Sequence, residues 1–177
     1  NNYNSDPDFT LWKSRNIEKQ KQSGFHNVQI KLILGDFNVS QAKALANIAE
    51  KYAGAMILCT VNQNLMIPWV RENAFGSIYA ELKKIGLNKA GTEEIRDITC
   101  CPGSETCNLG ITASRGLAQE LNKQMESGTQ PTKDLDHVSI KASGCPNSCG
   151  QHQIASIGFH GGAKKLNGIL TPHYEVL

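Results

Sequence analysis

Two short stretches decide how this sequence folds. They are Cys-Cys-Pro-Gly-Ser-Glu-Thr-Cys, residues 100–107, and Gly-Cys-Pro-Asn-Ser-Cys-Gly, residues 144–150. Each stretch follows a run that predicts a strand, and each surrounds its cysteines with glycine and proline. Glycine lets a backbone fold tightly around a bulky object, and proline stiffens the turn. The spacing Cys-x5-Cys, then Cys-x3-Cys, therefore predicts two loops that bring four thiolates to one inorganic centre.

Four thiolates from two loops are the ligand set of a cubane iron–sulfur cluster. Cys107, Cys145 and Cys149 are three of the candidates, and Cys100 and Cys101 compete for the fourth position. A helix predicted after Cys107 begins near this site. Its free amides would stabilise the charge of thiolate and sulfide.

Other uses of cysteine fit the pattern less well. A structural zinc site also takes four cysteines, but its pairs usually stand two to four residues apart, which disfavours a five-residue gap. Disulfides are disfavoured because no export signal is visible and the compartment is expected to be reducing. No cysteine has a neighbouring histidine that would mark it as a catalytic thiol. The sixth cysteine, Cys59, is predicted to be a small core residue in an apolar strand.

The composition excludes several classes of protein. The 177 residues suit one domain or two small ones, and 40% hydrophobic residues supply a core. A net charge of +2 gives no bulk attraction to nucleic acid. No apolar run reaches the roughly 18 residues of a membrane span, so no membrane partner and a cytoplasmic location are expected. The first residue is not Met, and the last ones look like the interior of a strand, which predicts a piece cut from a longer protein.

The pattern along the chain predicts an α+β fold, with helices on one face of an antiparallel sheet in the first module. Asp6 and Pro7 predict the start of the first helix and Ser40 is the expected cap of the second. The elements expected in this module are a helix over 7–20, a strand over 28–34, a helix from 40, a short buried strand over 56–60, its hairpin partner over 65–67 and a helix over 71–84.

The second half alternates short strands with one helix. A polar loop at 127–131 separates that helix from the second cysteine stretch, and Asn167-Gly168 predicts a hairpin turn. The five histidines are scattered and are expected on the surface of strands, with no metal role. The elements expected here are strands over 95–99, 138–140, 154–159 and 169–176, and a helix over 112–124.

The two cysteine stretches resemble the paired signatures of the nitrite and sulfite reductase haemoprotein family. Residues 101–111 and 144–151 carry this resemblance. Upstream, Leu34-Gly35-Asp36 and the stretch 60–65 are similar to the ferredoxin-like module that precedes the cluster domain in that family. The resemblance covers about residues 28–177. It implies a ferredoxin-like α/β module followed by a mixed α/β domain for sirohaem and a [4Fe–4S] cluster.

The resemblance also implies ligands and a reaction. Cys101, Cys107, Cys145 and Cys149 would hold a [4Fe–4S] cluster, and Cys149 would also bridge to the iron of sirohaem. Electrons from a ferredoxin or a flavoprotein would pass through the cluster to the haem. Nitrite would there become ammonia, or sulfite would become sulfide, in a six-electron reduction.

Family enzymes are built from two related halves with sirohaem between them. The half without the cluster usually reads Thr-x-Arg-Gln where this chain reads Thr-Val-Asn-Gln, residues 60–63. The cluster-bearing half usually has Asn at that place. The chain therefore resembles the C-terminal half, and its partner would be the related N-terminal half. The substrate-binding Arg and Lys residues of the family lie mainly in that other half, so no catalytic residue is assigned here.

Six further residues are candidates for contact with the cofactors, and each has a structural alternative. Asn147 would touch the cluster or haem, or else serve turn chemistry. The stretch Asn62, Gln63 and Asn64 would touch the macrocycle, or else form a polar hairpin loop. Arg115 and Lys141 would bind sirohaem carboxylates, or else be solvated surface charges.

The predicted organisation has three parts. Residues 1–26 form a helix and connector, 27–90 the ferredoxin-like module, and 91–177 the cluster and sirohaem domain, truncated at its C-terminal end. The main hypothesis is the cluster-bearing half of a sirohaem-dependent reductase. Two alternatives are an electron-transfer or cluster-carrier domain without activity of its own and a zinc-stabilised structural module. Bound sirohaem would separate the first two, and iron with acid-labile sulfide would exclude the third.

Overall fold

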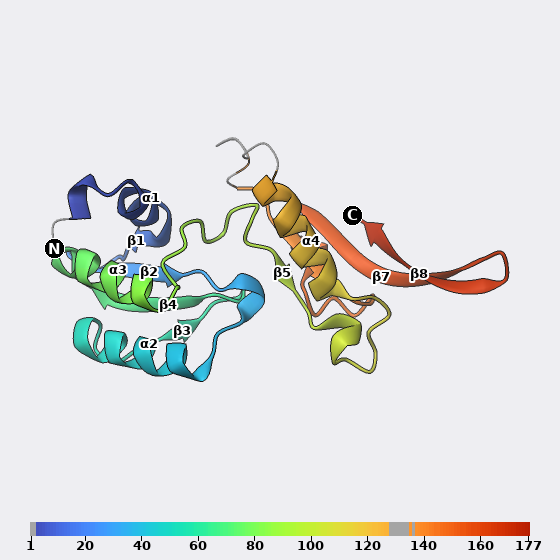
Figure 1. Cartoon of the computed structure of the whole chain (residues 1–177), viewed down its shortest axis with the longest axis horizontal. Helices are drawn as coiled ribbons and strands as arrows, with labels where there is room; N and C mark the ends of the chain where they lie inside the picture. The colour runs from blue at the N-terminus through green and yellow to red at the C-terminus, as the bar shows by residue number, and fades with distance from the viewer. Residues whose placement is uncertain (1–2, 128–134, 136) are drawn as a thin grey trace. The chain divides into compact units, whose positions relative to one another are not determined.

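The structure is a computed structural model that describes residues 3–127, 135 and 137–177. The chain forms two compact units, Asn1–Thr92 and Glu93–Leu177 (Figure 1). Most of the loop predicted over 127–131 lies outside the described residues. Within the described ranges, no helix is both long enough and apolar enough to cross a membrane.

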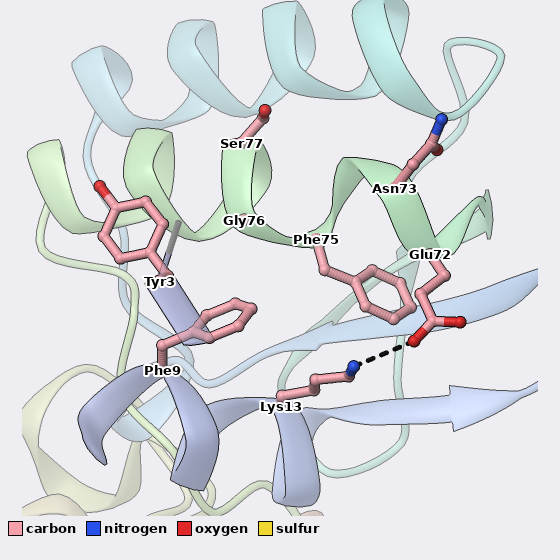
Figure 2. Close-up of a pocket in the computed structure, with 8 residues that line it drawn as sticks. All are labelled: Tyr3, Phe9, Lys13, Glu72, Asn73, Phe75, Gly76 and Ser77. Atoms are coloured by element: carbon pink, nitrogen blue, oxygen red, sulfur yellow. Dashed lines mark hydrogen bonds and ion pairs between the residues drawn. The ribbon is translucent and has the colours of Figure 1, made fainter. Parts of the chain in front are cut away.

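The first unit is built on a four-stranded antiparallel sheet in the order β1-β2-β4-β3. Three helices, α1, α2 and α3, pack side by side over it (Figures 1 and 2). Its elements are α1 (Pro7–Asn16), β1 (Ile17–Lys19), β2 (His26–Ile30), α2 (Val39–Tyr52), β3 (Leu58–Cys59), β4 (Leu65–Val70) and α3 (Phe75–Lys84), with 3-10 turns at Tyr3–Ser5, Ile33–Gly35 and Glu72–Ala74.

One apolar core lies between these helices and the sheet. It includes the residues of the N-terminal helix, because Phe9 and Trp12 are buried in it together with Tyr79. The Trp12 and Tyr79 rings stand 5.2 Å apart, within the range of favourable aromatic pairs. The N-terminal segment is thus part of the packed first unit rather than an appendage to it.

The first helix begins as predicted and ends earlier. Asp6 accepts hydrogen bonds from the amides of Asp8 and Phe9, and Pro7 occupies the first turn. The helix stops at Asn16 rather than near residue 20, because Ile17–Lys19 pairs with β2. Asn16 is fully buried, and its side chain bonds the backbone of Gln29, Lys89 and Gly91, which fixes this change of direction.

Three more predictions in this unit need correction. The second helix is capped by Asn38 in a capping box with Gln41, not by Ser40. The strand β2 ends at Ile30, and Leu34 lies in a 3-10 turn with a positive φ of 55°. Cys59 is exposed, because β3 is a two-residue strand at the edge of the sheet rather than a buried one.

The second unit has a mixed sheet in the order β5-β6-β7-β8. The strands β5, β6 and β7 are parallel to one another, and β8 returns antiparallel to β7. The helix α4 packs on β5 and β6 (Figure 1). The elements are β5 (Thr99–Cys100), α4 (Ser114–Ser127), β6 (Ile140–Ser143), β7 (Ile157–Leu166) and β8 (Ile169–Val176), with 3-10 turns at Gly103–Glu105 and His152–Ile154.

In this unit the predicted hairpin is confirmed, whereas two predicted strands have wrong bounds. Asn167 and Gly168 both have positive φ and join β7 to β8, as the sequence predicts for an Asn-Gly turn. The strand expected over 95–99 is only Thr99–Cys100, because turns occupy the residues before it. Ile154, expected to begin a strand, closes a 3-10 turn. The α+β class itself is confirmed.

Candidate cysteine cluster site

The sheet of the second unit brings the two cysteine stretches together. Cys101 directly follows β5, and Cys145 follows β6 after one residue. Because β5 and β6 are neighbouring parallel strands, their carboxyl ends lie at the same edge of the sheet. The amide of Cys101 donates to the carbonyl of Ala142 on β6. Parallel pairing thus places two cysteine loops, 44 residues apart in sequence (145 − 101), next to each other.

Glycines allow these two loops to touch through their backbones. A Cβ on Gly144 would stand 2.6 Å from Cα of Gly103 and 2.7 Å from the carbonyl oxygen of Thr112. A Cβ on Gly110 would stand 2.5 Å from the backbone of Gly103 and Ser104. Real side chains do not reach such distances, so these positions require glycine.

Hydrogen bonds join the loops as well. The amides of Ile111 and Thr112 both donate to the carbonyl of Gly144, at 2.8 and 3.0 Å. The amide of Gly144 in turn donates to Sγ of Cys101 at 3.1 Å. Ile111 and Thr112 therefore fix the carbonyl just before Cys145. In return, the second loop supplies a hydrogen-bond donor to the thiol of Cys101.

Cys101 has one backbone donor suited to a thiolate and a serine hydroxyl beside it. Besides the Gly144 amide, the hydroxyl of Ser114 lies 3.3 Å from its Sγ and donates to its carbonyl at 2.7 Å. Ser114 is the first residue of α4 and is fully buried. Backbone amides and a helix N-terminus favour negative charge, so this arrangement suits a metal-bound sulfur.

The remaining candidate ligands divide between interior and surface. Cys145 is buried like Cys101, whereas Cys107 and Cys149 are exposed. Cys100, the competitor of Cys101, is buried in β5. The loops thus offer two thiols at their base and two at their outer side.

The zinc-stabilised module stays a prediction. Zinc needs four ligand atoms about 2.0–2.3 Å from one ion. In the part of the chain that the structure describes, no group of three or more His, Cys, Asp or Glu side chains could hold one metal ion. In a cubane each thiolate binds a different iron, so its ligands do not converge on one point.

Of the two basic candidates, Arg115 pairs with an acid in the first cysteine loop. Its Nε lies 3.4 Å from Oε2 of Glu105, and its side chain is only 20% exposed. Glu105 stands between Cys101 and Cys107, so this pair ties α4 to the loop. Arg115 is therefore a partly buried loop contact rather than a solvated surface charge.

Lys141 is not a surface residue either. It is buried in β6, and its ammonium donates to Oγ1 of Thr99 at 3.4 Å and to Oε1 of Gln151 at 3.2 Å. Burial lowers the pKa of Lys141, while the charges of Asp97 and Glu93 act in the opposite direction. The alternative of a solvated charge is wrong for Lys141, because it lies inside the sheet that carries both loops.

The asparagine candidates have different surroundings. Asn147 is exposed in a turn at the outer side of the second loop. Asn64 belongs to the first unit and is 1% exposed, and its Oδ1 accepts from the amide of Leu32 at 2.9 Å. That burial gives Asn64 an architectural role in place of the expected contact with a macrocycle. Asn62 and Gln63, in the same hairpin, are less buried and stay predictions.

Several polar residues around the loops escaped prediction. Thr112, Ser114, Ser143 and His152 are all buried, and His152 in particular was expected on a strand surface. Burial raises the pKa of Tyr174, and the nearby Cys101 and Cys100 raise it further, while Thr112 acts in the opposite direction. Serine, threonine and histidine are common on surfaces, so residue type alone gave no signal of their burial.

A separate pocket of about 390 Å³ lies in the first unit. Figure 2 shows it between α1 and α3, with the ion pair of Lys13 and Glu72 beside the ring of Phe75. It contains no cysteine and none of the predicted site residues. The candidate cysteine site therefore lies apart from this pocket, in the second unit.

The fold and the loops together define an α+β protein with two cysteine loops at one edge of a parallel pair of strands. Two family models match the chain. The model described as the nitrite/sulfite reductase ferredoxin-like half domain covers residues 18–85, and that of the nitrite and sulphite reductase 4Fe-4S domain covers 91–170. The chain therefore belongs to the nitrite and sulfite reductase family, with a ferredoxin-like half domain followed by a 4Fe-4S domain.

Known proteins agree with this assignment. The chain is 30% identical over 154 residues to the chloroplastic ferredoxin–nitrite reductase of Spinacia oleracea, and 26% identical over 175 residues to the assimilatory ferredoxin-dependent nitrite reductase of Haloferax mediterranei. These alignments cover 85% and 98% of this chain. They cover 25% and 30% of the relatives, so the chain spans about a quarter to a third of the curated relatives that it matches.

Solved structures show the same fold. The NirA protein of Mycobacterium tuberculosis superimposes with a TM-score of 0.73 at 25% identity, over 92% of this chain and 30% of that one. A dissimilatory sulfite reductase superimposes with a TM-score of 0.63 over 80% of this chain and 34% of that one; at 15% identity this likeness shows the fold alone.

Proposed function

We propose that Cys101, Cys107, Cys145 and Cys149 hold a [4Fe–4S] cluster, and that the chain acts as the cluster-bearing, C-terminal half of a sirohaem-dependent nitrite or sulfite reductase. The observation that carries the proposal is the reciprocal hydrogen bonding between the two loops. The Gly144 amide donates to Sγ of Cys101 while the first loop donates to the Gly144 carbonyl. A donor of this kind favours a charged, metal-bound sulfur over a neutral thiol.

The cluster and sirohaem, when bound, supply one-electron transfer and an iron centre for the reduction of nitrite to ammonia or of sulfite to sulfide. The chain's own residues would hold and tune them. The Gly144 amide stabilises charge on the Cys101 sulfur, and the Ser114 hydroxyl holds the Cys101 backbone by donating to its carbonyl. By its resemblance to the family motif, Cys149 would also hold the sirohaem iron; it is exposed, as Cys107 is.

The remaining assignments concern the macrocycle and the partners. We keep Arg115, Asn147, Asn62 and Gln63 as proposed sirohaem contacts. Lys141 is buried and bonded to Gln151, so we assign it to the base of the second loop instead. The proposed partners are the related N-terminal half and a ferredoxin or flavoprotein that donates electrons, and the proposed substrate is nitrite or sulfite. The proposed location is the cytoplasm, and we propose no nucleic-acid or membrane partner.

A second candidate is a cluster carrier without activity of its own. It is favoured by the placement of all four proposed ligands in the second unit, so that binding a cluster needs no residue from elsewhere. The two candidates differ in whether the protein also takes sirohaem.

The test is the visible spectrum of anaerobically purified protein, together with its iron and acid-labile sulfide content. We expect about four irons and four sulfides per chain for a cubane, with sirohaem bands in the spectrum. Cluster without sirohaem would favour the carrier, and a colourless chain that takes up no iron would contradict both candidates. Cys149→Ser should lose the sirohaem bands as well as the cluster, while Cys59→Ser, exposed in the first unit, should change neither.

A further inference from the structure

The second cysteine loop is closed at its base by one buried hydroxyl. Ser143, the last residue of β6, receives the amide of Gly150 on its Oγ at 3.0 Å. The same Oγ lies 2.9 Å from Nδ1 of His152. Ser143 is 1% exposed and His152 is 3% exposed. The chain thus leaves the sheet at Ser143, passes through both cysteines and returns to the same side chain.

This closure acts on the peptide that follows Cys149. The Gly150 nitrogen belongs to the peptide bond between Cys149 and Gly150, so holding it fixes the backbone from which the Cys149 thiol projects. Gly150 also packs directly on β6, because a Cβ there would collide with the Ala142 carbonyl. A second contact, from Lys141 to Gln151, holds the next residue to the same strand.

The hydrogen bonds of Ser143 are complete in one state of His152. The hydroxyl has one hydrogen, and its oxygen already accepts from Gly150. A neutral His152 with its hydrogen on Nε2 accepts that hydrogen at Nδ1. A protonated His152 would donate at Nδ1 instead. The Ser143 oxygen has two lone pairs and can accept from both His152 and Gly150, but the hydroxyl hydrogen then loses its acceptor and must turn away.

The surroundings of His152 favour the neutral ring. Burial lowers the pKa of His152, and the nearby His160 lowers it further. The His160 ring on β7 has its centroid 4.9 Å from that of His152, and its Nε2 lies 3.4 Å from Glu175 on β8. His173 reaches the other oxygen of Glu175 at 3.4 Å. From β6 the charged group on this side is Lys141, which ends on Gln151.

We infer that Ser143 and His152 are positioning residues for Cys149, and that neutral His152 keeps the Ser143 hydroxyl aligned on the Gly150 amide. The inference rests on the proposed cluster site and deepens it. Both side chains act through the backbone after Cys149. Partners of this outer kind orient metal ligands in many sites.

The test uses the whole chain, reconstituted anaerobically with iron and sulfide. The readout is the rate of cluster loss to an iron chelator, measured from pH 8 down to about 5.5, across the range where histidine titrates. Ser143→Ala and His152→Phe should lose the cluster roughly ten- to a hundredfold faster than wild type at pH 8. His152→Asn, which keeps an acceptor close to the ring Nδ1 position, should restore most of the lifetime.

The pH dependence separates positioning from packing. Wild type should lose its cluster faster as the pH falls, whereas His152→Asn should show a flatter profile because its amide does not titrate. The matched controls are Ser139→Ala and His137→Asn, the first bonded to Ser156 away from the loop and the second exposed. Both should follow wild type at every pH.

Two results would overturn the inference. Ser143→Ala and His152→Phe could keep the cluster as long as wild type, or His152→Asn could follow the wild-type pH profile. If Ser143→Ala does not fold, the profile of His152→Asn decides alone. A wild-type chain that takes up no iron and sulfide would instead contradict the proposed function, and the inference would fall with it.

Discussion

The two units of this protein bury different kinds of side chain. In the described residues, the largest fully buried side chains all belong to the first unit, and Trp12, Tyr79 and Ile78 are among them. The buried residues of the second unit are mostly small or polar. They include Ile98, Cys100, Cys101, Ala118, Ile140, Ala142, Cys145, Asp97, Thr99, Thr112, Ser114, Lys141, Ser143 and His152.

This difference indicates two sources of stability. Burial of apolar area stabilises the first unit in the usual way. In the second unit, close backbone contacts at glycine and hydrogen bonds around the two cysteine loops stabilise the fold in place of large buried side chains. A site of that kind gains stability from its metal, because binding to the folded state alone favours folding. The first unit should therefore fold without cofactor, and the second should depend on it.

The largest effect is expected at the contact between the loops. In Gly144→Ala the new Cβ would meet the backbone of Gly103 and Thr112 at 2.6–2.7 Å, so the loops must separate. We expect loss of cluster binding and of hydrogen-exchange protection at the Ile111 and Thr112 amides, with the first unit unchanged.

The matched control is Gly116→Ala in α4, where the nearest atom would be the Ala113 Cβ at 3.7 Å. Gly116 lies in the first turn of α4, so alanine there should stabilise by less than the roughly 1 kcal/mol that applies to a helix interior. Unchanged protection at Ile111 and Thr112 in Gly144→Ala would show that glycine contacts do not organise the site.

The next effect concerns the apolar core of the first unit. Trp12→Ala removes a fully buried ring that packs against Phe9 and Tyr79. We expect a loss of about 3–5 kcal/mol in the free energy of unfolding of the first unit. Denaturant unfolding followed by far-UV circular dichroism measures it in both proteins. Leu11→Ala, at a position 46% exposed on the same helix, is the control. If Trp12→Ala lowered the free energy of unfolding of the second unit as much as that of the first, the two units would not have separate sources of stability.

A smaller effect should appear as a pH dependence of the second unit. The pKa of His152 is lowered in the folded protein, so the unfolded chain binds a proton more readily. Stability is therefore fully present above the ordinary histidine pKa of about 6.5 and falls as the pH drops below it. One such group gives a slope of at most about 1.4 kcal/mol per pH unit.

Unfolding of the second unit between pH 8 and 5 tests this slope. The slope should flatten in His152→Asn and persist in His137→Asn, whose side chain is exposed. A wild-type slope that His152→Asn leaves unchanged would mean that other groups set the acid sensitivity.

The smallest effect is expected at the ion pair between α4 and the first loop. Arg115 lies 3.4 Å from Glu105, and both side chains retain contact with solvent. Arg115→Gln should therefore cost no more than about 1 kcal/mol in the second unit. The control is Lys123→Gln, exposed on the same helix. Thermal unfolding compares the two, and a loss several times larger would assign Arg115 a role in holding the loop itself.

Local chemistry made part of the fold predictable. Asp6 with Pro7, and Asn167 with Gly168, act through their immediate neighbours, so their cap and turn could be read from sequence. The strand β1 could not, because three residues become a strand only through pairing with β2. Cys59 looked like a core residue because its neighbours are apolar, but the sheet order places it at an edge.

The candidate site also has features that were predictable from sequence and features that were not. The cysteine spacing and the glycines predicted two tight loops, and parallel pairing of β5 and β6 brings these loops together. The ligand set itself stays a prediction, with Cys101 preferred over Cys100 through the family resemblance. The burial of Ser143, His152 and Lys141 was not predictable, since it follows from the parallel pairing of β6 with β5 and β7. Asn64 was assigned to a cofactor because of its neighbours in sequence, and the structure instead bonds it to Leu32 across the sheet.

The central claim is that four of the six cysteines hold one [4Fe–4S] cluster. The most direct measurement is iron and acid-labile sulfide per chain in six single Cys→Ser variants prepared anaerobically. Cys101→Ser, Cys107→Ser, Cys145→Ser and Cys149→Ser should lose most of both, whereas Cys59→Ser and Cys100→Ser should keep the wild-type content of about four of each. Equal loss in Cys100→Ser and Cys101→Ser, or retention in all six, would contradict the account.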